Sequence, residues 1–163
     1  MSRTKHFKGF SIVDGDIKVN LNMSRFSRQY QEAQYLLDGM VMDSMVPFMP
    51  MITSNFINRT RAESTSLQGS GKVCAAAAPY GRFLYEGKGM VDEATGSPYA
   101  RRGAKKVLVS QFSGQTAAKE NLEYTRQAHP RAQAKWFDAA KRQYGDTWIR
   151  KVKAQAGGGR HGR

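Results

Sequence analysis

The eleven residues from Ala78 to Lys88 read APYGRFLYEGK and predict one short helix with a defined start and a defined end. Pro79 suits the first turn of a helix, where its missing N–H costs nothing, and Gly87 suits the left-handed position just past a helix end. A strand end, a helix start and a helix stop therefore fall together within one stretch. We interpret it as an architectural joint and not as a reaction centre.

One face of this predicted helix is apolar. Tyr80, Phe83 and Leu84 fall at positions i, i+3 and i+4, so we expect them to anchor the core. The other large side chains of the predicted helix point away from that face. These are Arg82, Tyr85 and Glu86.

Upstream of the joint, a strand is predicted to lead into a long helix. Residues 17–22 alternate between apolar and polar after a turn signal at 14–16, which is typical of a half-buried strand. Ser24 is a candidate cap for a helix over residues 25–45, which Pro47 ends. Its apolar stripe favours a helix laid on a sheet, and an amphipathic segment that binds a groove is the alternative.

Between the long helix and the joint, the pattern predicts a short helix followed by a hairpin. The helix is expected to end near Thr60. Two strand candidates follow, residues 62–67 and 72–77, and Gly69-Ser70-Gly71 lies between them. Glycines at such a position favour an antiparallel hairpin.

After the joint, residues 88–119 show no helical period and contain four glycines and one proline. A short strand is predicted where Val107 to Phe112 gather apolar side chains. A connection of this length inside a compact domain is usually functional or is ordered by a neighbour. It also carries a basic cluster, which comprises Arg101, Arg102, Lys105 and Lys106.

Downstream of His129-Pro130, two short helices in tandem are predicted to present aromatic faces. The first has an apolar stripe between residues 132 and 144, Gly145 is expected to break the helix, and Asp146 is expected to cap its successor. The aromatic residues expected in the core are Trp136, Phe137 and Trp148.

These elements together predict an α+β protein. Its small antiparallel sheet is packed by the long N-terminal helix, short helices follow the hairpin and end the chain, and a long loop is inserted between them. A length of 163 residues suits one core. We therefore predict a single domain over residues 1–156, with 88–119 as an extended assembly loop, and a flexible basic tail at 157–163.

The charge of the chain is strongly basic and uneven. The net charge is +13, and residues 101–163 alone hold fifteen Lys or Arg against four Asp or Glu. Such an asymmetry indicates a polyanion or an acidic partner near the C-terminal part. A further basic group there comprises Arg150, Lys151 and Lys153.

No constellation of residues predicts catalysis, a metal site or a cofactor. Cys74 is the only cysteine, so no intrachain disulfide is possible, and we expect it to be a small buried residue. The three histidines, His6, His129 and His161, are not spaced as zinc ligands. No stretch has the length of a membrane span or a signal peptide, so we expect a soluble intracellular protein that contacts no membrane.

Four blocks of this sequence resemble the tail-completion or neck proteins of long-tailed bacteriophages, especially the minor capsid proteins of phages of Gram-positive hosts. The strand-then-helix opening at 17–33 is similar to the start of that family. Residues 50–56, PMITSNF, resemble its Pro-x-x-Thr-Gly-Asn-Leu turn, with Ser54 where glycine is usual and Phe56 in place of leucine.

The two later blocks are more distinctive. The joint at 78–88 is similar to the family's Ala-Pro-Tyr-Ala-Arg-Tyr-x-x-x-Gly pattern. Residues 129–141, HPRAQAKWFDAAK, resemble its His-Pro-x-Ala-x-x-x-Trp-Phe-x-x-Ala-Lys ending, and Trp148 follows. The blocks span about residues 17–150 in order, whereas the loop at 89–122 matches less well.

The resemblance implies a structural protein and not an enzyme. It implies an α+β protomer that forms a ring, with sixfold symmetry expected, in the neck of the virion around the channel for double-stranded DNA. Its expected neighbours are the head-closing connector and the tail terminator of the same virion, and assembly is expected in the host cytoplasm. Candidate residues of the ring interface are Arg82, Tyr85, Glu86 and Lys88.

The basic residues have two possible partners under this reading, namely DNA phosphates or the acidic surface of a neighbouring ring. The candidate contacts are Arg101, Arg102, Lys105, Lys106, Arg150, Lys151 and Lys153. The alternative function is a nucleic-acid-binding module without catalysis, which the basic C-terminal part and its aromatic residues favour. A hydrolase or nuclease has the least support.

Overall fold

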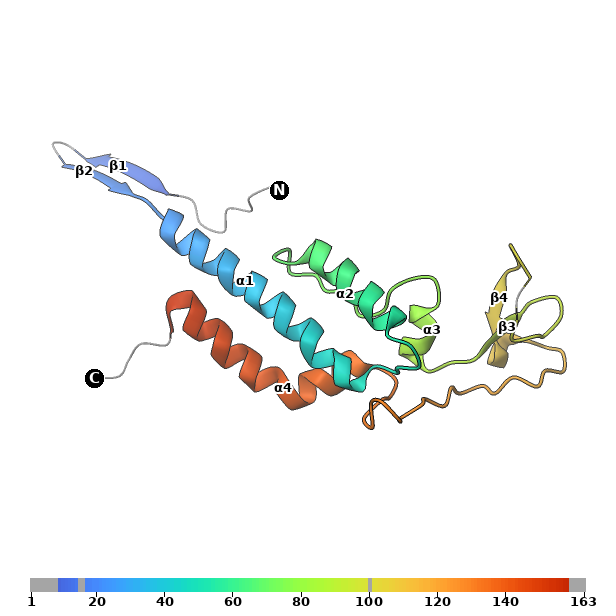
Figure 1. Cartoon of the computed structure of the whole chain (residues 1–163). Helices are drawn as coiled ribbons and strands as arrows, with labels where there is room; N and C mark the ends of the chain where they lie inside the picture. The colour runs from blue at the N-terminus through green and yellow to red at the C-terminus, as the bar shows by residue number, and fades with distance from the viewer. Residues whose placement is uncertain (1–8, 15–16, 100, 159–163) are drawn as a thin grey trace.

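The computed structural model describes residues 9–14, 17–99 and 101–158 of the chain. The described part is α+β, as predicted, with four α-helices and two separate two-stranded antiparallel sheets. Figure 1 shows an elongated molecule in which a helical body lies between the two sheets. His6, His161, the tail beyond residue 158 and most of the turn predicted at 14–16 lie outside the described residues.

The long N-terminal helix is confirmed as α1, Ser24–Met45, and a short 3-10 turn, η1 (Val46–Phe48), follows it. Its first turn is stabilised differently from the prediction. The Asn22 Oδ1 atom accepts a hydrogen bond of 2.9 Å from the Ser24 N–H, and the Ser24 side chain makes no cap. Asn22 thus takes the capping part that we had expected of Ser24.

Helix α1 packs against other helices and not on a sheet. Helix α4, Trp136–Lys153, runs antiparallel beside it, and α2, Asn55–Leu67, lies on another side (Figure 1). The stripe therefore faces a helical core, and the predicted helix-on-sheet packing is wrong. The core is rich in methionine, whose flexible side chains fill irregular gaps, and its buried methionines are Met42, Met45 and Met49.

The hairpin predicted over residues 62–77 is wrong, because α2 continues to Leu67. Its buried residues, Phe56, Ile57, Thr60 and Ser64, follow helical spacing. The Thr60 hydroxyl oxygen accepts a hydrogen bond of 3.3 Å from the Ala77 N–H, which holds the following segment against the helix without strand pairing. The buried hydroxyl side chains made this face hard to distinguish from a polar strand.

The joint forms in part as predicted: the glycine stop is confirmed, whereas Pro79 precedes the helix instead of lying in its first turn, and residues 72–77 form no strand before it. Helix α3 spans Gly81–Glu86, and Gly87 ends it in the left-handed region with a φ of 71°. Leu84 packs against the core and Phe83 is partly buried. Tyr80 is 49% exposed and contacts the ring of Phe56 at 5.8 Å, so the prediction that it anchors the core is wrong.

The C-terminal region forms one helix and not two. Helix α4 begins at Trp136 and runs through Gly145 without a break. A glycine inside a helix costs roughly 1 kcal/mol relative to alanine, and burial of Trp148 in the following turn outweighs that cost. A short π-helical turn, η3 (Ala154–Gly158), ends the described chain.

The two sheets lie at opposite ends of the molecule (Figure 1). At one end β1, Phe10–Asp14, pairs with β2, Ile17–Leu21, and β2 is exposed along its whole length instead of half-buried. At the other end β3, Met90–Asp92, pairs with β4, Lys106–Leu108. Strand β4 confirms the short strand predicted after Val107, although a 3-10 turn, η2 (Val109–Gln111), ends it early.

Candidate assembly surfaces

Trp136 connects the joint to the helical core. It is fully buried, and its Nε1–H donates a hydrogen bond of 2.8 Å to the Ala75 carbonyl. The rings of Phe56 and Tyr85 meet it edge to face, with centroids 5.9 and 5.0 Å away. Edge-to-face pairs add to the energy of burial. The core role predicted for Trp136 is therefore confirmed.

The other two aromatic residues predicted for the core also lie there. Trp148 is buried, and its Nε1–H donates to the Ser44 hydroxyl at 3.1 Å. Phe137 is partly buried and stacks on Trp148, with the ring centroids 6.4 Å apart. The hydrogen bond from Trp148 to Ser44 links α4 to α1.

The four residues proposed for a ring interface differ in their surroundings. Tyr85 packs inward on Trp136, and burial raises the pKa of its phenol, as do the nearby carboxylates of Asp138 and Glu86. Arg82 is exposed, so it remains open to a partner. Glu86 and Lys88 are engaged within the chain, Glu86 with Lys135 at 3.8 Å and Lys88 with Asn121 at 2.8 Å.

The long connection after the joint is closed at its base by backbone hydrogen bonds. The Gly89 N–H donates to the Glu120 carbonyl at 2.8 Å, and the Leu122 N–H donates to the Gly87 carbonyl at 2.9 Å. The Tyr124 hydroxyl donates to the Leu84 carbonyl and joins the returning chain to α3. We call this arrangement the clasp, defined by residues 87–89 and 120–122. The clasp closes the long connection between these two segments into an ordered unit, which we call the lobe.

Asp92 organises the outer end of this lobe. Its side chain is buried and accepts hydrogen bonds from the Ala94 N–H at 2.9 Å and from Arg101 Nε at 3.2 Å. These two donors lower the pKa of the Asp92 carboxyl from its ordinary value of 3.8 to about 2. Arg101 therefore has a structural part inside the chain.

We expect the lobe to lose this support in strong acid. The folded-state pKa lies below the unfolded one, so the ionised Asp92 stabilises the lobe fully above about pH 4 and loses that effect as the pH falls toward 2. Carbon-detected NMR titration of Asp92 should give a midpoint near 2, and Arg101→Ala should move it upward. A midpoint at the ordinary value of 3.8 would show that the hydrogen bonds do not form in solution.

Three members of the basic cluster in the lobe are engaged within the chain. Besides Arg101, the Lys105 Nζ atom lies 3.0 Å from Glu93 Oε1, and Lys106 Nζ donates to the Pro98 carbonyl at 2.8 Å. Arg102 is exposed and makes no ion pair with any described residue. Most of this cluster thus stabilises the lobe, whatever else it contacts.

The second predicted basic group lies at the other end of the molecule. Arg150, Lys151 and Lys153 occupy the last turns of α4, far from the lobe (Figure 1). Cations there interact favourably with the negative end of the helix dipole. All three are exposed, and within the described ranges none forms an ion pair. The residues predicted as one contact set therefore belong to two separate surfaces.

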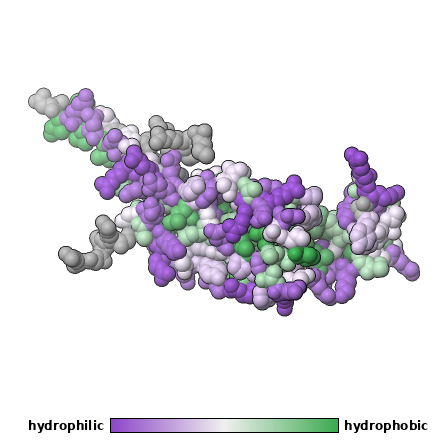
Figure 2. All heavy atoms as spheres, viewed as in Figure 1, coloured by the Kyte–Doolittle hydropathy of each residue, from purple (hydrophilic) through white to green (hydrophobic). Residues whose placement is uncertain are grey.

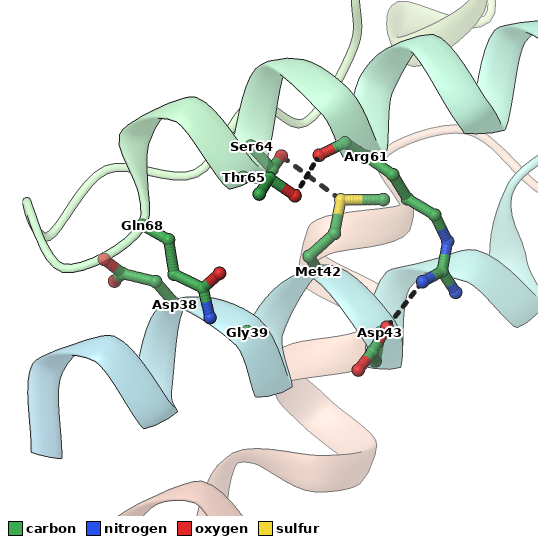
Figure 3. A pocket seen from close by; sticks show the side chains of 8 residues that line it. All are labelled: Asp38, Gly39, Met42, Asp43, Arg61, Ser64, Thr65 and Gln68. Atoms are coloured by element: carbon green, nitrogen blue, oxygen red, sulfur yellow. Dashed lines mark hydrogen bonds and ion pairs between the residues drawn. The ribbon is translucent and has the colours of Figure 1, made fainter. Parts of the chain in front are cut away.

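A small polar hollow, of about 200 Å³, lies between α1 and α2 (Figure 3). At one end Arg61 Nη1 and Asp43 Oδ1 are 2.9 Å apart. At the other end buried Asp38 accepts hydrogen bonds from the N–H groups of Gly69 and Gly71, at 2.8 and 3.1 Å. This role was not predicted, and the only sign of it in the sequence is a carboxylate among the apolar residues of α1. Asp38 holds the turn after α2 in place.

Two residues considered for chemistry have structural contacts. The Cys74 thiol lies 3.2 Å from Glu63 Oε2, and burial, followed by Glu63, raises its pKa, which disfavours the reactive thiolate. His129 Nδ1 lies 2.8 Å from the Met49 carbonyl, in a segment that precedes α4 and is not helical. Across the described ranges, no three His, Cys, Asp or Glu side chains gather as a metal site.

Comparison with known proteins gave no relative. The chain matches no family model, and searches of curated proteins and of solved structures found no match. In the part of the chain that the structure describes, no helix combines the length and the apolar character needed for a bilayer span.

Proposed function

We propose that this chain is a structural protein of a bacteriophage neck, which forms a ring between the head-closing connector and the tail terminator around the DNA channel. Four sequence blocks resemble the neck proteins of long-tailed phages, and this resemblance is the reason for proposing a phage neck. The observation that carries the proposal is the extended shape: a small helical core with a projecting element at each end, the β1–β2 hairpin and the clasped lobe (Figure 1).

Projecting elements of this kind are suited to contacts between subunits. An isolated two-stranded hairpin is marginally stable in water, and the unpaired backbone groups of an edge strand can pair with another chain. For the ring itself, the lobe of one protomer and the helical body of the next supply two different surfaces, and such contacts close into a ring if each step turns by a fixed angle. The expectation of six subunits comes from the resemblance.

The charge distribution suits a channel that DNA passes through. The chain carries a net charge of +13, and Arg102 in the lobe is exposed and forms no ion pair with a described residue, so the protomer attracts phosphates. Such contacts attract DNA without reading its sequence. A diffuse basic field is compatible with passage, whereas tight recognition would retain the DNA.

A phage in which this gene is inactivated provides the test. Electron micrographs of infected cells are expected to show DNA-filled heads separate from tails, because the joining ring is missing. The intact gene supplied from a plasmid should restore joined particles. Normal joined virions without the protein would overturn the proposal. A lack of joined virions together with empty heads would also contradict the proposal, because empty heads place the defect in DNA packaging.

A further inference from the structure

The β1–β2 hairpin is an uncovered element with an apolar character. Ile17, Val19 and Leu21 alternate along β2 and are 67%, 45% and 43% exposed. Residues that alternate along a strand share one face of it. The hairpin therefore carries an apolar face, which projects beyond the N-terminus of α1 (Figures 1 and 2).

A further large apolar side chain is exposed on the first turn of α1. Phe26 is 48% exposed there. Because large apolar side chains rarely gather on the surface of a protein that works alone, such a patch marks an interaction site. We call Ile17, Val19, Leu21 and Phe26 the hairpin patch.

Several cations lie at the same end of the molecule as the hairpin patch. The η3 turn packs beside the first half of α1, where Gln155 Nε2 donates to Glu32 Oε2 at 3.2 Å, and this places the last turns of α4 there. Residues 17–32 and 141–153 contain eight Lys or Arg and two Asp or Glu. Within the described residues no ion pair engages the cations nearest the patch, which are Lys18, Arg25, Arg28, Arg150, Lys151 and Lys153.

The charge argues that a different chain covers this surface. In the described part of the molecule, seven acidic side chains already form ion pairs with the chain's own cations, and they are Asp43, Glu63, Glu86, Asp92, Glu93, Glu120 and Glu123. Buried Asp38 is also engaged. A second copy therefore offers few free carboxylates to six cations.

The apolar residues argue for protein and not for nucleic acid. Phosphates would pair with the cations but would leave the hairpin face exposed to water. An apolar centre with a charged rim is the usual anatomy of a protein interface. We propose that the hairpin patch and its cations dock onto a different protein subunit, whose apolar groove is bordered by carboxylates. The inference rests on the proposed function for the assembly in which that subunit stands.

Site-specific photo-cross-linking of the full chain during phage assembly tests this partner. A cross-linking amino acid at Val19 should join the chain to another virion protein, at a segment rich in Asp and Glu. Ile52 is 85% exposed and lies before α2, so the same amino acid there is the control and should not capture that protein. Capture of a second copy, of DNA, or of nothing at position 19 would overturn the inference.

Purified variants measure the contact. Val19→Asp should weaken binding to the captured subunit by about thirtyfold, since a central apolar contact is lost and a charge is buried. The double variant Lys151→Glu, Lys153→Glu should slow association, with a reduced dependence on salt. Tyr99→Asp, at an exposed site in the lobe, should bind normally. Because the hairpin stands apart from the core, Val19→Asp should unfold in urea as the parent does.

Different results would contradict the neck function and the docking surface. If phages that lack the gene still make joined virions, the neck function is wrong. If those phages fail to join while phages carrying Val19→Asp assemble normally, the neck function stands and the docking surface is wrong.

Discussion

Replacement of Trp136 with alanine is expected to lower the free energy of unfolding by about 3 to 5 kcal/mol. The side chain is fully buried, and it contacts Phe56 and Tyr85 from two other helices. Its loss leaves a cavity at the point where the joint, α2 and α4 meet, and it removes the donor for the Ala75 carbonyl. Urea denaturation followed by circular dichroism gives the measurement.

Two variants separate the contributions to this effect. Trp136→Phe keeps an aromatic ring but leaves the Ala75 carbonyl without its donor, so we expect a cost of about 1 to 3 kcal/mol. Tyr99→Ala removes an aromatic side chain that is 87% exposed and should change stability by less than about 0.5 kcal/mol. A loss from Trp136→Ala as small as that of Tyr99→Ala would show that the core is organised differently.

Replacement of Gly89 with alanine is expected to open the clasp while the helical core remains folded. A Cβ atom at this position would meet the Lys119 carbonyl oxygen far inside van der Waals contact, and backbone cannot move aside as a flexible side chain can. The hydrogen bonds from Gly89 to Glu120 and from Leu122 to Gly87 should then break. Hydrogen exchange in residues 87–92 and 119–124 should become faster by about tenfold or more.

The control for this variant is Ser110→Ala, because Ser110 is exposed in the same lobe and lies next to β4. It should leave exchange in the clasp unchanged. Exchange in α1 and α4 should stay slow in both variants. If Gly89→Ala leaves the clasp protected, the close approach of the two backbone segments is wrong. If it unfolds α4 as well, the lobe and the core form one cooperative unit.

Features with local causes were predictable. The end of α1 before Pro47 follows from the missing N–H of proline, and the left-handed residue after α3 follows from glycine at position 87. The apolar stripe of α1 has a helical period that no strand can share. In each case the deciding interaction lies within a few residues, so one sequence contains it.

Features that depend on tertiary contacts could not be predicted from the sequence. The α2 helix replaced a predicted hairpin because Thr60 and Ser64 are buried by groups distant in sequence, including the Cys74 carbonyl, which accepts from the Ser64 hydroxyl at 2.9 Å. Gly145 did not break α4, because α1 packs along both halves of that helix. A weak local preference yields when packing supplies more energy than it costs.

The joint and the candidate surfaces likewise combine features with local causes and features that depend on tertiary contacts. A short helix with a glycine stop within residues 78–88 is encoded locally, because glycine and helical spacing act over short distances. What the side chains in and around that helix contact depends on tertiary packing. In the folded chain Tyr85 packs on Trp136 and Arg101 forms an ion pair with Asp92. The cations at the end of α4 lie at the same end of the molecule as the hairpin. Contacts between distant segments depend on the three-dimensional path of the whole chain, and a local pattern does not contain that path.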